Sequence, residues 1–350
     1  MSNSSEFFIS RGYLKEYLGH DTCVVVPNGV KGISENAFHE SETITSILLP
    51  DSLTRICWNA FKNLKSLKEI KIPKNVTIIG GFAFSGCVSL EEISIPAGIE
   101  RIDECFLNGC NGVIKLDVDP GNRVYQSINN CLIDKSKKTL VAGIQTSQIP
   151  DDGSVVRIAN SAFRGCAKLA SIVIPDTVEC IDWYAFAECT ELTNVVIGTG
   201  VTEIENRVFS GCSKLKSVTV GNKVEKIGEG VFEFCTSLVD VMLPTSLKVI
   251  GAFAFSRCEN LQSLTIPDSV QEIGRFAFSG CSHIKTITIP KGTKKIEEHI
   301  FSGCRFLEKI GFKGTVKEWK KTIDFTHLGE GLSIREIHCC DGVATIQFVY

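Results

Sequence analysis

One phrase of residue types returns along this chain at a fixed spacing. The stretch AFSGCVSLEEISIPAGIERI at residues 83–102 is repeated almost type for type as AFSGCSHIKTITIPKGTKKI at residues 277–296. Each copy is marked by one phenylalanine, at Phe38, Phe61, Phe84, Phe106, Phe163, Phe186, Phe209, Phe232, Phe255, Phe278 and Phe301. Eight of the ten intervals between these markers are 23 residues, one is 22 and one is 57. A period of this length and fidelity indicates supersecondary units stacked in a row.

Prolines and cysteines keep the same period. The prolines lie at Pro27, Pro50, Pro73, Pro96, Pro175, Pro244, Pro267 and Pro290, with Gly198 and Gly221 at the two places where a proline is missing. Nine cysteines follow the marker phenylalanine by three or four residues, at Cys87, Cys110, Cys166, Cys189, Cys212, Cys235, Cys258, Cys281 and Cys304. A column of this kind favours buried, reduced thiols that act as small hydrophobes, because its members do not form pairs.

One repeat can be interpreted from residues 67–87. The alternation of apolar and charged residues in EIKI, residues 69–72, is typical of a strand with one solvated face, and Pro73 ends it. Val76 and Ile79 form a second short apolar pair, and Gly80 marks a bend. The segment FAFSGC predicts one or two helical turns held by the packing of Phe84.

Stacked repeats of this type predict an α/β repeat solenoid. We expect a curved leucine-rich-repeat stack with a parallel sheet on one face, short helical turns on the other and an inserted β-hairpin. The pattern L-x-x-I-x-I-P-x-x-V-x-x-I-G-x-x-A-F-x-x-C resembles the 23-residue leucine-rich repeat of BspA-like proteins, which occur in gut and oral bacteria and in some protists. The resemblance covers about residues 20–312.

Five segments are expected along the chain. They are an N-terminal cap (residues 1–26), a first block of repeats (27–116), an inserted β-hairpin (117–149), a second block of repeats (150–312) and a C-terminal cap (313–350). The 57-residue interval amounts to one repeat plus 34 extra residues, with two apolar runs around the polar turn DKSKK. This insertion is interpreted either as a tolerated spacer that shields the stack or as a binding protrusion. In the C-terminal cap, Trp319 is expected to plug the last repeat.

Composition limits the classes of partner. The formal net charge is −3, which provides no field for a polyanion, so nucleic acid is not expected as a partner. No window holds the roughly 18 uninterrupted apolar residues of a membrane helix, so no membrane insertion is expected. The N-terminus lacks a basic stretch followed by an apolar run and thus predicts no secretory signal peptide.

The sequence offers no recognisable catalytic or metal site. The six histidines are scattered, and none lies in a nucleophile, base or metal motif. The cysteine column lacks the spacing and histidine partners of a zinc site, and HCCD at residues 338–341 falls in a capping strand. We therefore expect no enzyme activity, no cofactor and no metal.

The candidate binding surface is the outward face of the strands. In the centre of the chain it comprises Ser171, Val173, Asn194, Val196, Ser217, Thr219, Asp240 and Met242, in two parallel columns. Its apolar members can mark a partner site, or can simply reflect the preference of β-branched residues for strands. A second candidate is an aromatic set before the marker phenylalanine: Trp58, Phe82, Trp183, Tyr184, Phe253 and Phe276. These rings serve either as interface anchors or as lids over the turns.

Two functional hypotheses remain. The family resemblance implies a surface-associated adhesion or host-interaction module that presents its strand face to a protein or glycan. The absence of a visible export signal and the sixteen cysteines favour instead an intracellular, cytoplasmic scaffold of the same shape. In either case we expect a monomer.

Overall fold

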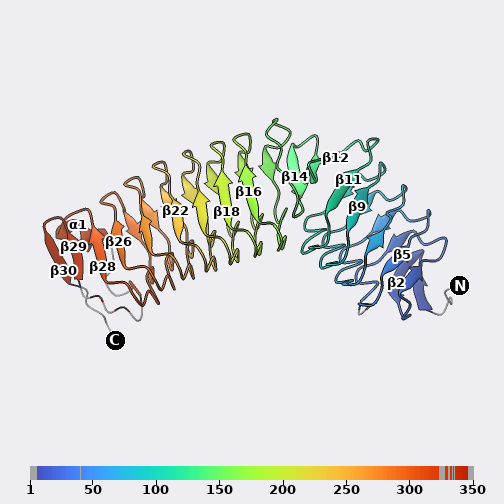
Figure 1. Cartoon of the computed structure of the whole chain (residues 1–350), viewed down its shortest axis with the longest axis horizontal. Coiled ribbons are helices and arrows are strands. Elements are labelled where there is room, and N and C mark those ends of the chain that lie inside the picture. Colours follow the sequence, from blue (N-terminus) through green and yellow to red (C-terminus); the bar gives the residue numbers. More distant parts are fainter. Residues whose placement is uncertain are drawn as a thin grey trace. The chain divides into compact units, whose positions relative to one another are not determined.

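The fold is a repeat solenoid, as the sequence predicts. A computed structural model describes residues 6–39, 41–322, 328–329, 332, 334 and 336–345. The chain divides into two compact units, Met1–Leu169 and Ala170–Tyr350, which are considered separately. Within each unit the strands of successive repeats lie side by side, as Figure 1 shows.

The first unit begins with a hairpin and continues as two stacks of parallel strands. The hairpin strands β1 (Phe7–Ser10) and β2 (Tyr13–Tyr17) are antiparallel, and β2 pairs with the first short strand. The short strands are β4 (Gly32–Ile33), β6 (Arg55–Ile56), β8 (Ile78–Ile79) and β10 (Arg101–Ile102). The other strands form two sheets: β3 (Cys23–Val25), β5 (Ser46–Leu48) and β7 (Glu69–Ile70), then β9 (Glu92–Ile95) and β11 (Lys115–Val118).

The insertion in the first unit is an antiparallel meander of three strands. Strands β12 (Tyr125–Ile128) and β13 (Cys131–Asp134) are joined by two asparagines with left-handed backbones, Asn129 and Asn130. Strand β14 (Thr139–Ala142) pairs with β13 around the turn that the sequence predicts, and then runs parallel to β15 (Arg157–Ile158). The insertion therefore rejoins the short-strand stack.

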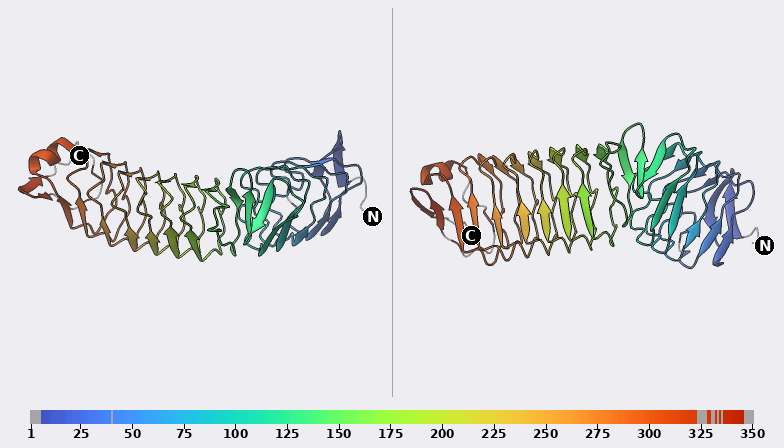
Figure 2. Two further views of the ribbon diagram at one scale, coloured as in Figure 1. Left: turned by 90° about the horizontal axis from the view of Figure 1, so that it is seen from above. Right: turned by 45° about the horizontal axis from the view of Figure 1, so that its top comes forward.

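The second unit repeats the same scheme with greater regularity, as the two further views in Figure 2 show. Its longer strands form two sheets: β16 (Ser171–Ile174), β18 (Asn194–Ile197), β20 (Ser217–Thr219) and β22 (Asp240–Met242), then β24 (Ser263–Thr265), β26 (Thr286–Ile289), β28 (Lys309–Phe312), β29 (Glu336–Cys339) and β30 (Gly342–Thr345). Its short strands are β17 (Cys180–Ile181), β19 (Glu203–Ile204), β21 (Lys226–Ile227), β23 (Val249–Ile250), β25 (Glu272–Ile273) and β27 (Lys295–Ile296). The helix α1 (Val316–Thr322) follows β28.

The prediction of a single parallel sheet backed by helical turns is wrong in two respects. A second strand of two residues, such as Ile78–Ile79, pairs in register with the equivalent residues of its neighbours and so forms a second parallel sheet. Moreover, α1 is the one α-helix among the described residues, so the stack has almost no helical character. The α in the predicted α/β class is not supported.

Left-handed residues explain why the turns are not helical. In the turn around Phe84, Phe82 has φ of 54° and Gly86 has φ of 76°, and neither value is compatible with an α-helix. Alternate amides bond in two directions: the Ser85 N–H donates to the Phe82 carbonyl within the turn, whereas the Phe84 N–H donates to the Phe106 carbonyl of the next repeat. The turns thus form a hydrogen-bonded ladder along the stack.

The hydrogen-bond register also corrects the 22-residue interval. The Phe61 N–H donates to the Ala83 carbonyl, and the equivalent Phe84 N–H donates to the Phe106 carbonyl, so Phe106 lies at the alanine position. Leu107 therefore takes the marker position, 23 residues after Phe84. Both residues are buried, so phenylalanine replaces the usual alanine and leucine replaces the usual phenylalanine at this level of the core. Counted from Leu107, the next interval is 56 residues, and the insertion adds 33 residues rather than 34.

The core consists of columns of identical residues. Every marker phenylalanine is buried, and neighbouring rings stack at 5.3–5.8 Å in most of the described pairs. All sixteen cysteines are free, and eight of the nine in the column are buried, which confirms the predicted core ladder; Cys166 is half-buried. Trp319 is fully buried against Phe312, with ring centroids 5.1 Å apart, and so plugs the end of the stack as predicted.

Candidate partner-binding surface

The eight predicted residues of the strand face lie in two straight columns. Parallel pairing of β16, β18, β20 and β22 places Ser171 beside Asn194, Asn194 beside Ser217 and Ser217 beside Asp240. The same register aligns the second column, which consists of Val173, Val196, Thr219 and Met242. Seven of the eight side chains are exposed and Ser217 is half-buried, because their strand neighbours alternate into the core.

The two columns differ in chemistry. The first is polar, and the Ser217 hydroxyl donates a 2.8 Å hydrogen bond to Asn194 Oδ1 across adjacent strands. The second is largely apolar: Val173 is 61% exposed, Val196 43% and Met242 63%. A strip of polar groups therefore lies beside a strip of exposed apolar groups on this face.

A second surface, which sequence reasoning missed, is a hollow on the strand face of the first unit. It has a volume of about 590 Å³ and is lined by Cys23, Ser46, Ile47, Leu48, Lys68, Glu69, Ile70, Lys71, Glu91, Glu92 and Ser94. The hollow lies where sheet pairing is interrupted, since β7 ends one sheet and β9 begins another. Its size falls within the range of small-ligand sites.

The lining of the hollow is apolar at one end and charged at the other. Leu48 is 59% exposed and neighbours Val25 in register, whereas Lys68 and Glu69 come from the next repeat along the stack. Only the identity of these residues is visible in the sequence. The hollow itself depends on how the sheet divides between β7 and β9, which no local pattern reveals.

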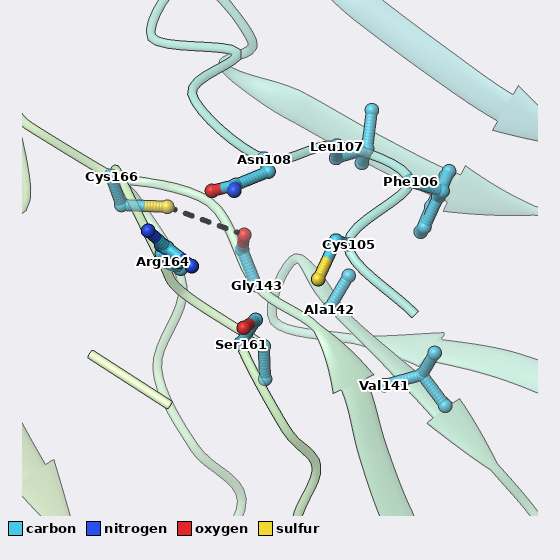
Figure 3. A pocket seen from close by; sticks show the side chains of 11 residues that line it. Cys105, Phe106, Leu107, Asn108, Val141, Ala142, Gly143, Ser161, Arg164 and Cys166 are labelled. Atoms are coloured by element: carbon cyan, nitrogen blue, oxygen red, sulfur yellow. Dashed lines mark hydrogen bonds between the residues drawn. The ribbon is translucent and has the colours of Figure 1, made fainter. Parts of the chain in front are cut away.

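A smaller cavity lies where the insertion meets the stack, as Figure 3 shows. Its lining includes Cys105, Gly143, Ser161 and Cys166, and the Cys166 thiol points to the Gly143 carbonyl at 3.6 Å. Gly143 is required here because a Cβ atom would lie 1.9 Å from the Phe163 ring. The cavity volume of about 10 Å³ leaves room for about one water molecule and belongs to the packing of the insertion.

The buried cysteines of the column do not form a reactive site. Burial raises the pKa of the Cys87 thiol to about 12, and it raises the pKa of Cys235 and Cys258 well above the ordinary value. Because the thiolate is the reactive and metal-binding form, these side chains are inert at neutral pH. Among the described residues, no group of three or more His, Cys, Asp or Glu side chains could hold a metal ion.

The aromatic set divides between two roles. Trp58 and Trp183 are exposed by 48% and 52%, and the Trp183 indole donates to Glu205 at 2.8 Å. The others are half-buried, and Phe253 stacks on Phe276 at 5.1 Å. The half-buried rings pack over the turns as lids, whereas the two tryptophans leave much of their surface in water.

Comparison with known proteins defines the family. The family described as BspA type leucine rich repeat region (6 copies) matches residues 31–150, 140–252 and 226–348, which together span most of the chain. The chain belongs to the BspA-type leucine-rich repeat family. The BspA-type repeats thus account for both units, and the family resemblance seen in the sequence is confirmed. No curated protein matches the chain.

Solved structures share this BspA-type fold at low sequence identity. A leucine-rich cell surface protein of Faecalibacterium prausnitzii is 24% identical, with 92% of this chain and 96% of that chain covered and a TM-score of 0.58. A leucine-rich repeat protein of Eubacterium ventriosum is 22% identical, with coverage of 77% and 88% and a TM-score of 0.55. The pneumococcal vaccine antigen PcpA is 17% identical, with coverage of 89% and 88% and a TM-score of 0.53. These likenesses concern the fold.

No helix among the described residues is both long and apolar enough to cross a membrane.

Proposed function

We propose that this BspA-type chain is a non-catalytic scaffold that binds a protein or glycan through its strand face. The observation that carries the proposal is the pair of aligned columns in the second unit, where Val173, Val196 and Met242 expose apolar surface in register. On the strand face, side chains of successive repeats form one continuous surface. An adhesion role facing a host is the preferred form of this proposal, with an intracellular scaffold as the alternative.

The buried thiols remove one argument for a cytoplasmic location. Reduced cysteines are typical of the cytoplasm when they are accessible, but eight members of the column are buried and engaged in packing. Burial protects these thiols in the folded chain, so the column does not by itself favour the cytoplasm. Since a similar structure belongs to a protein described as a cell surface protein, we favour the cell surface for this chain. Fractionation of the organism tests this choice.

The binding test places charge on the strand face without disturbing the core. Val196→Lys together with Met242→Lys adds two charges to exposed positions, beside the buried Ile197 and the half-buried Leu243. We expect the melting temperature to stay within a few degrees while affinity for the captured partner falls at least tenfold, about 1.4 kcal/mol. The partner is first captured from host extracellular matrix and from the organism's own lysate, side by side.

Two matched variants locate the site. Thr265 and Thr288 are exposed and continue the second column beyond Met242. Thr265→Lys with Thr288→Lys therefore adds the same two charges outside the central segment, and should leave binding unchanged if that segment is the site. Leu48→Lys tests the hollow of the first unit. Loss of binding in Leu48→Lys alone would move the site to that hollow, and unfolding of the Val196/Met242 variant would contradict the strand assignment.

A further inference from the structure

One column of turn residues in the second unit departs from the pattern of the repeat. The residue two positions after the marker phenylalanine has a left-handed backbone in every repeat of this unit: Glu188 (φ 62°), Gly211 (φ 76°), Phe234 (φ 61°), Arg257 (φ 61°), Gly280 (φ 72°) and Gly303 (φ 72°). Glycine adopts this conformation without steric cost, and the repeat uses glycine at three of the six places. Three of the first four positions instead carry an acid (Glu188), an aromatic ring (Phe234) and a base (Arg257).

Phe234 is the most costly of these exceptions. A bulky residue with positive φ is a steric outlier, and Phe234 in addition leaves 48% of its surface exposed. Neither the strained backbone nor the exposed ring stabilises the isolated chain. A residue that departs from the usual backbone and burial preferences, without a compensating contact within the fold, is expected where a surface binds a partner.

The four residues from Glu188 to Arg257 lie directly above one another. The Glu188 N–H donates to the Ser210 carbonyl and the Gly211 N–H to the Glu233 carbonyl, each at 2.8 Å. The Phe234 N–H donates to the Ser256 carbonyl at 2.9 Å, which continues the ladder to Arg257. Successive members are thus about one strand spacing, roughly 4.8 Å, apart. We call this row the edge column.

One level of the edge column carries no side chain. A Cβ atom added to Gly211 would lie 3.6 Å from Glu188 Cγ, an ordinary van der Waals contact, so the Glu188 side chain borders this level. The small side chains of Ser210 and Ser256 come immediately before Gly211 and Arg257 in the chain. In order, the edge column therefore presents a carboxylate, a bare backbone, a ring and a guanidinium.

We propose that a second copy of this chain docks on the edge column in an antiparallel, two-fold arrangement. With the two-fold axis between the Gly211 and Phe234 levels, the Phe234 ring packs on the bare backbone of the partner's Gly211. The same axis places Arg257 opposite the partner's Glu188. Each contact occurs twice, as an isologous interface requires. The monomer expected from the sequence is then the dissociated form.

The charge order favours the antiparallel arrangement over a parallel one. A parallel pair would bring Arg257 against the partner's Arg257 and Glu188 against the partner's Glu188, which is repulsive. The contact involves four residues of each copy and is small, so the dimer is a weak one. The edge column lies in the turns, whereas Val196 and Met242 lie in the strands, so this inference does not depend on the proposed function.

Sedimentation velocity of the full chain tests the dimer. The protein is measured from about 10 μM to 1 mM at low ionic strength, over the range in which weak dimers form. We expect the sedimentation coefficient of the wild type to rise with concentration. In Phe234→Gly the dissociation constant should rise at least tenfold, while the melting temperature should stay equal or increase because glycine relieves the backbone. Phe306→Ser, which removes another exposed ring (57% exposed), is the matched control and should dimerise normally.

Charge reversal distinguishes the two-fold arrangement from nonspecific association. Glu188→Arg alone and Arg257→Glu alone should each abolish the dimer, whereas a mixture of these two single variants should form a heterodimer because both of its ion pairs are then attractive. The double variant carrying both changes should also dimerise. A wild type that stays monomeric to 1 mM, or a dimer that persists in Phe234→Gly and in both single charge variants, would overturn the proposal.

Discussion

A marker phenylalanine inside the stack, such as Phe209, is enclosed by the same residue of its two neighbours. The Phe209 ring stacks on Phe186 at 5.4 Å and on Phe232 at 5.8 Å, with an interplanar angle of only 4° to Phe232. Truncation of one ring leaves a void, because the neighbouring rings are held in place by their own backbone hydrogen bonds and cannot move in to fill it.

Removal of one ring should therefore be costly. We expect Phe209→Ala to lower the free energy of unfolding by about 3–5 kcal/mol, through the lost apolar contact and the cavity between two fixed neighbours. Denaturant-induced unfolding followed by circular dichroism measures this change. A loss below about 1 kcal/mol would show that the ring is not interior.

The cysteine column satisfies a specific backbone group. The thiols of Cys87, Cys212 and Cys304 donate to the carbonyls of Phe61, Phe186 and Phe278 at 3.1–3.2 Å, and others in the column do the same. This contact explains why the repeat uses cysteine where alanine or valine would also fill the space, since an unpaired buried carbonyl is unfavourable.

The protonation of these thiols predicts their reactivity and a loss of stability in alkali. Burial raises the pKa of Cys87 and Cys304 to about 12, above the ordinary value near 9, so the native state binds more protons than the unfolded state in this interval. Stability should be unaffected below pH 9 and decline between pH 9 and 12.

At pH 8 a thiol reagent should modify the exposed Cys23, Cys180 and Cys340 rapidly, whereas rapid modification of the column cysteines would contradict their burial.

At the scale of elements, the insertion is joined to the stack by side chains that replace missing backbone partners. The short-strand stack of the first unit is interrupted after β10, and there the Ile102 N–H donates to the Tyr125 hydroxyl at 3.0 Å. Asn122 donates to the carbonyls of Pro96 and Ile99, and its Oδ1 accepts from the Tyr125 N–H at 2.7 Å. The motif N-R-V-Y at residues 122–125 thus ends one ladder and starts the next.

Removal of the tyrosine hydroxyl tests this joint. In Tyr125→Phe the buried Ile102 N–H loses its acceptor, so the free energy of unfolding should fall by about 1–3 kcal/mol. Thermal unfolding compared with Thr139→Ala provides the measurement, because the exposed Thr139 hydroxyl donates only to the nearby Lys137 carbonyl. Equal melting temperatures for the two variants would mean that the Tyr125 hydroxyl does not support the junction.

The elements also show where local sequence is insufficient. Alternation in residues 69–72 and in its equivalents predicts the exposed strand columns, because side-chain direction follows from period two alone. The turns could not be predicted in the same way. Whether the Phe84 N–H donates within its own turn or to the next repeat depends on the neighbouring repeat. A positive φ angle cannot be predicted from the sequence where the residue is a phenylalanine, such as Phe82 or Phe234, rather than a glycine.

At the scale of the whole molecule, the sequence period predicts which residues stack in columns and which of them are buried. It does not predict where the stack is interrupted. The pair Phe106–Leu107 replaces the alanine and phenylalanine of other repeats, so the sequence suggests a deletion where the hydrogen-bond register contains none. The hollow of the first unit arises from a break between β7 and β9. Sequence therefore predicts what recurs in every repeat, and a binding surface is made by what differs between repeats.

The uniform register has a consequence for how such a chain can evolve. Each level of the turn ladder is linked to the next by the same bonds, such as those from Phe232 to Ala254 and from Phe255 to Ala277. Unequal recombination between repeats would insert or excise whole multiples of 23 codons and leave both flanking levels able to bond to each other. Length variants of this kind would keep the N-terminal hairpin and the Trp319 plug, whereas a gain or loss of one codon would leave one repeat out of step with its neighbours. A lineage can thus change the reach of the molecule in discrete steps while its capping ends remain under selection.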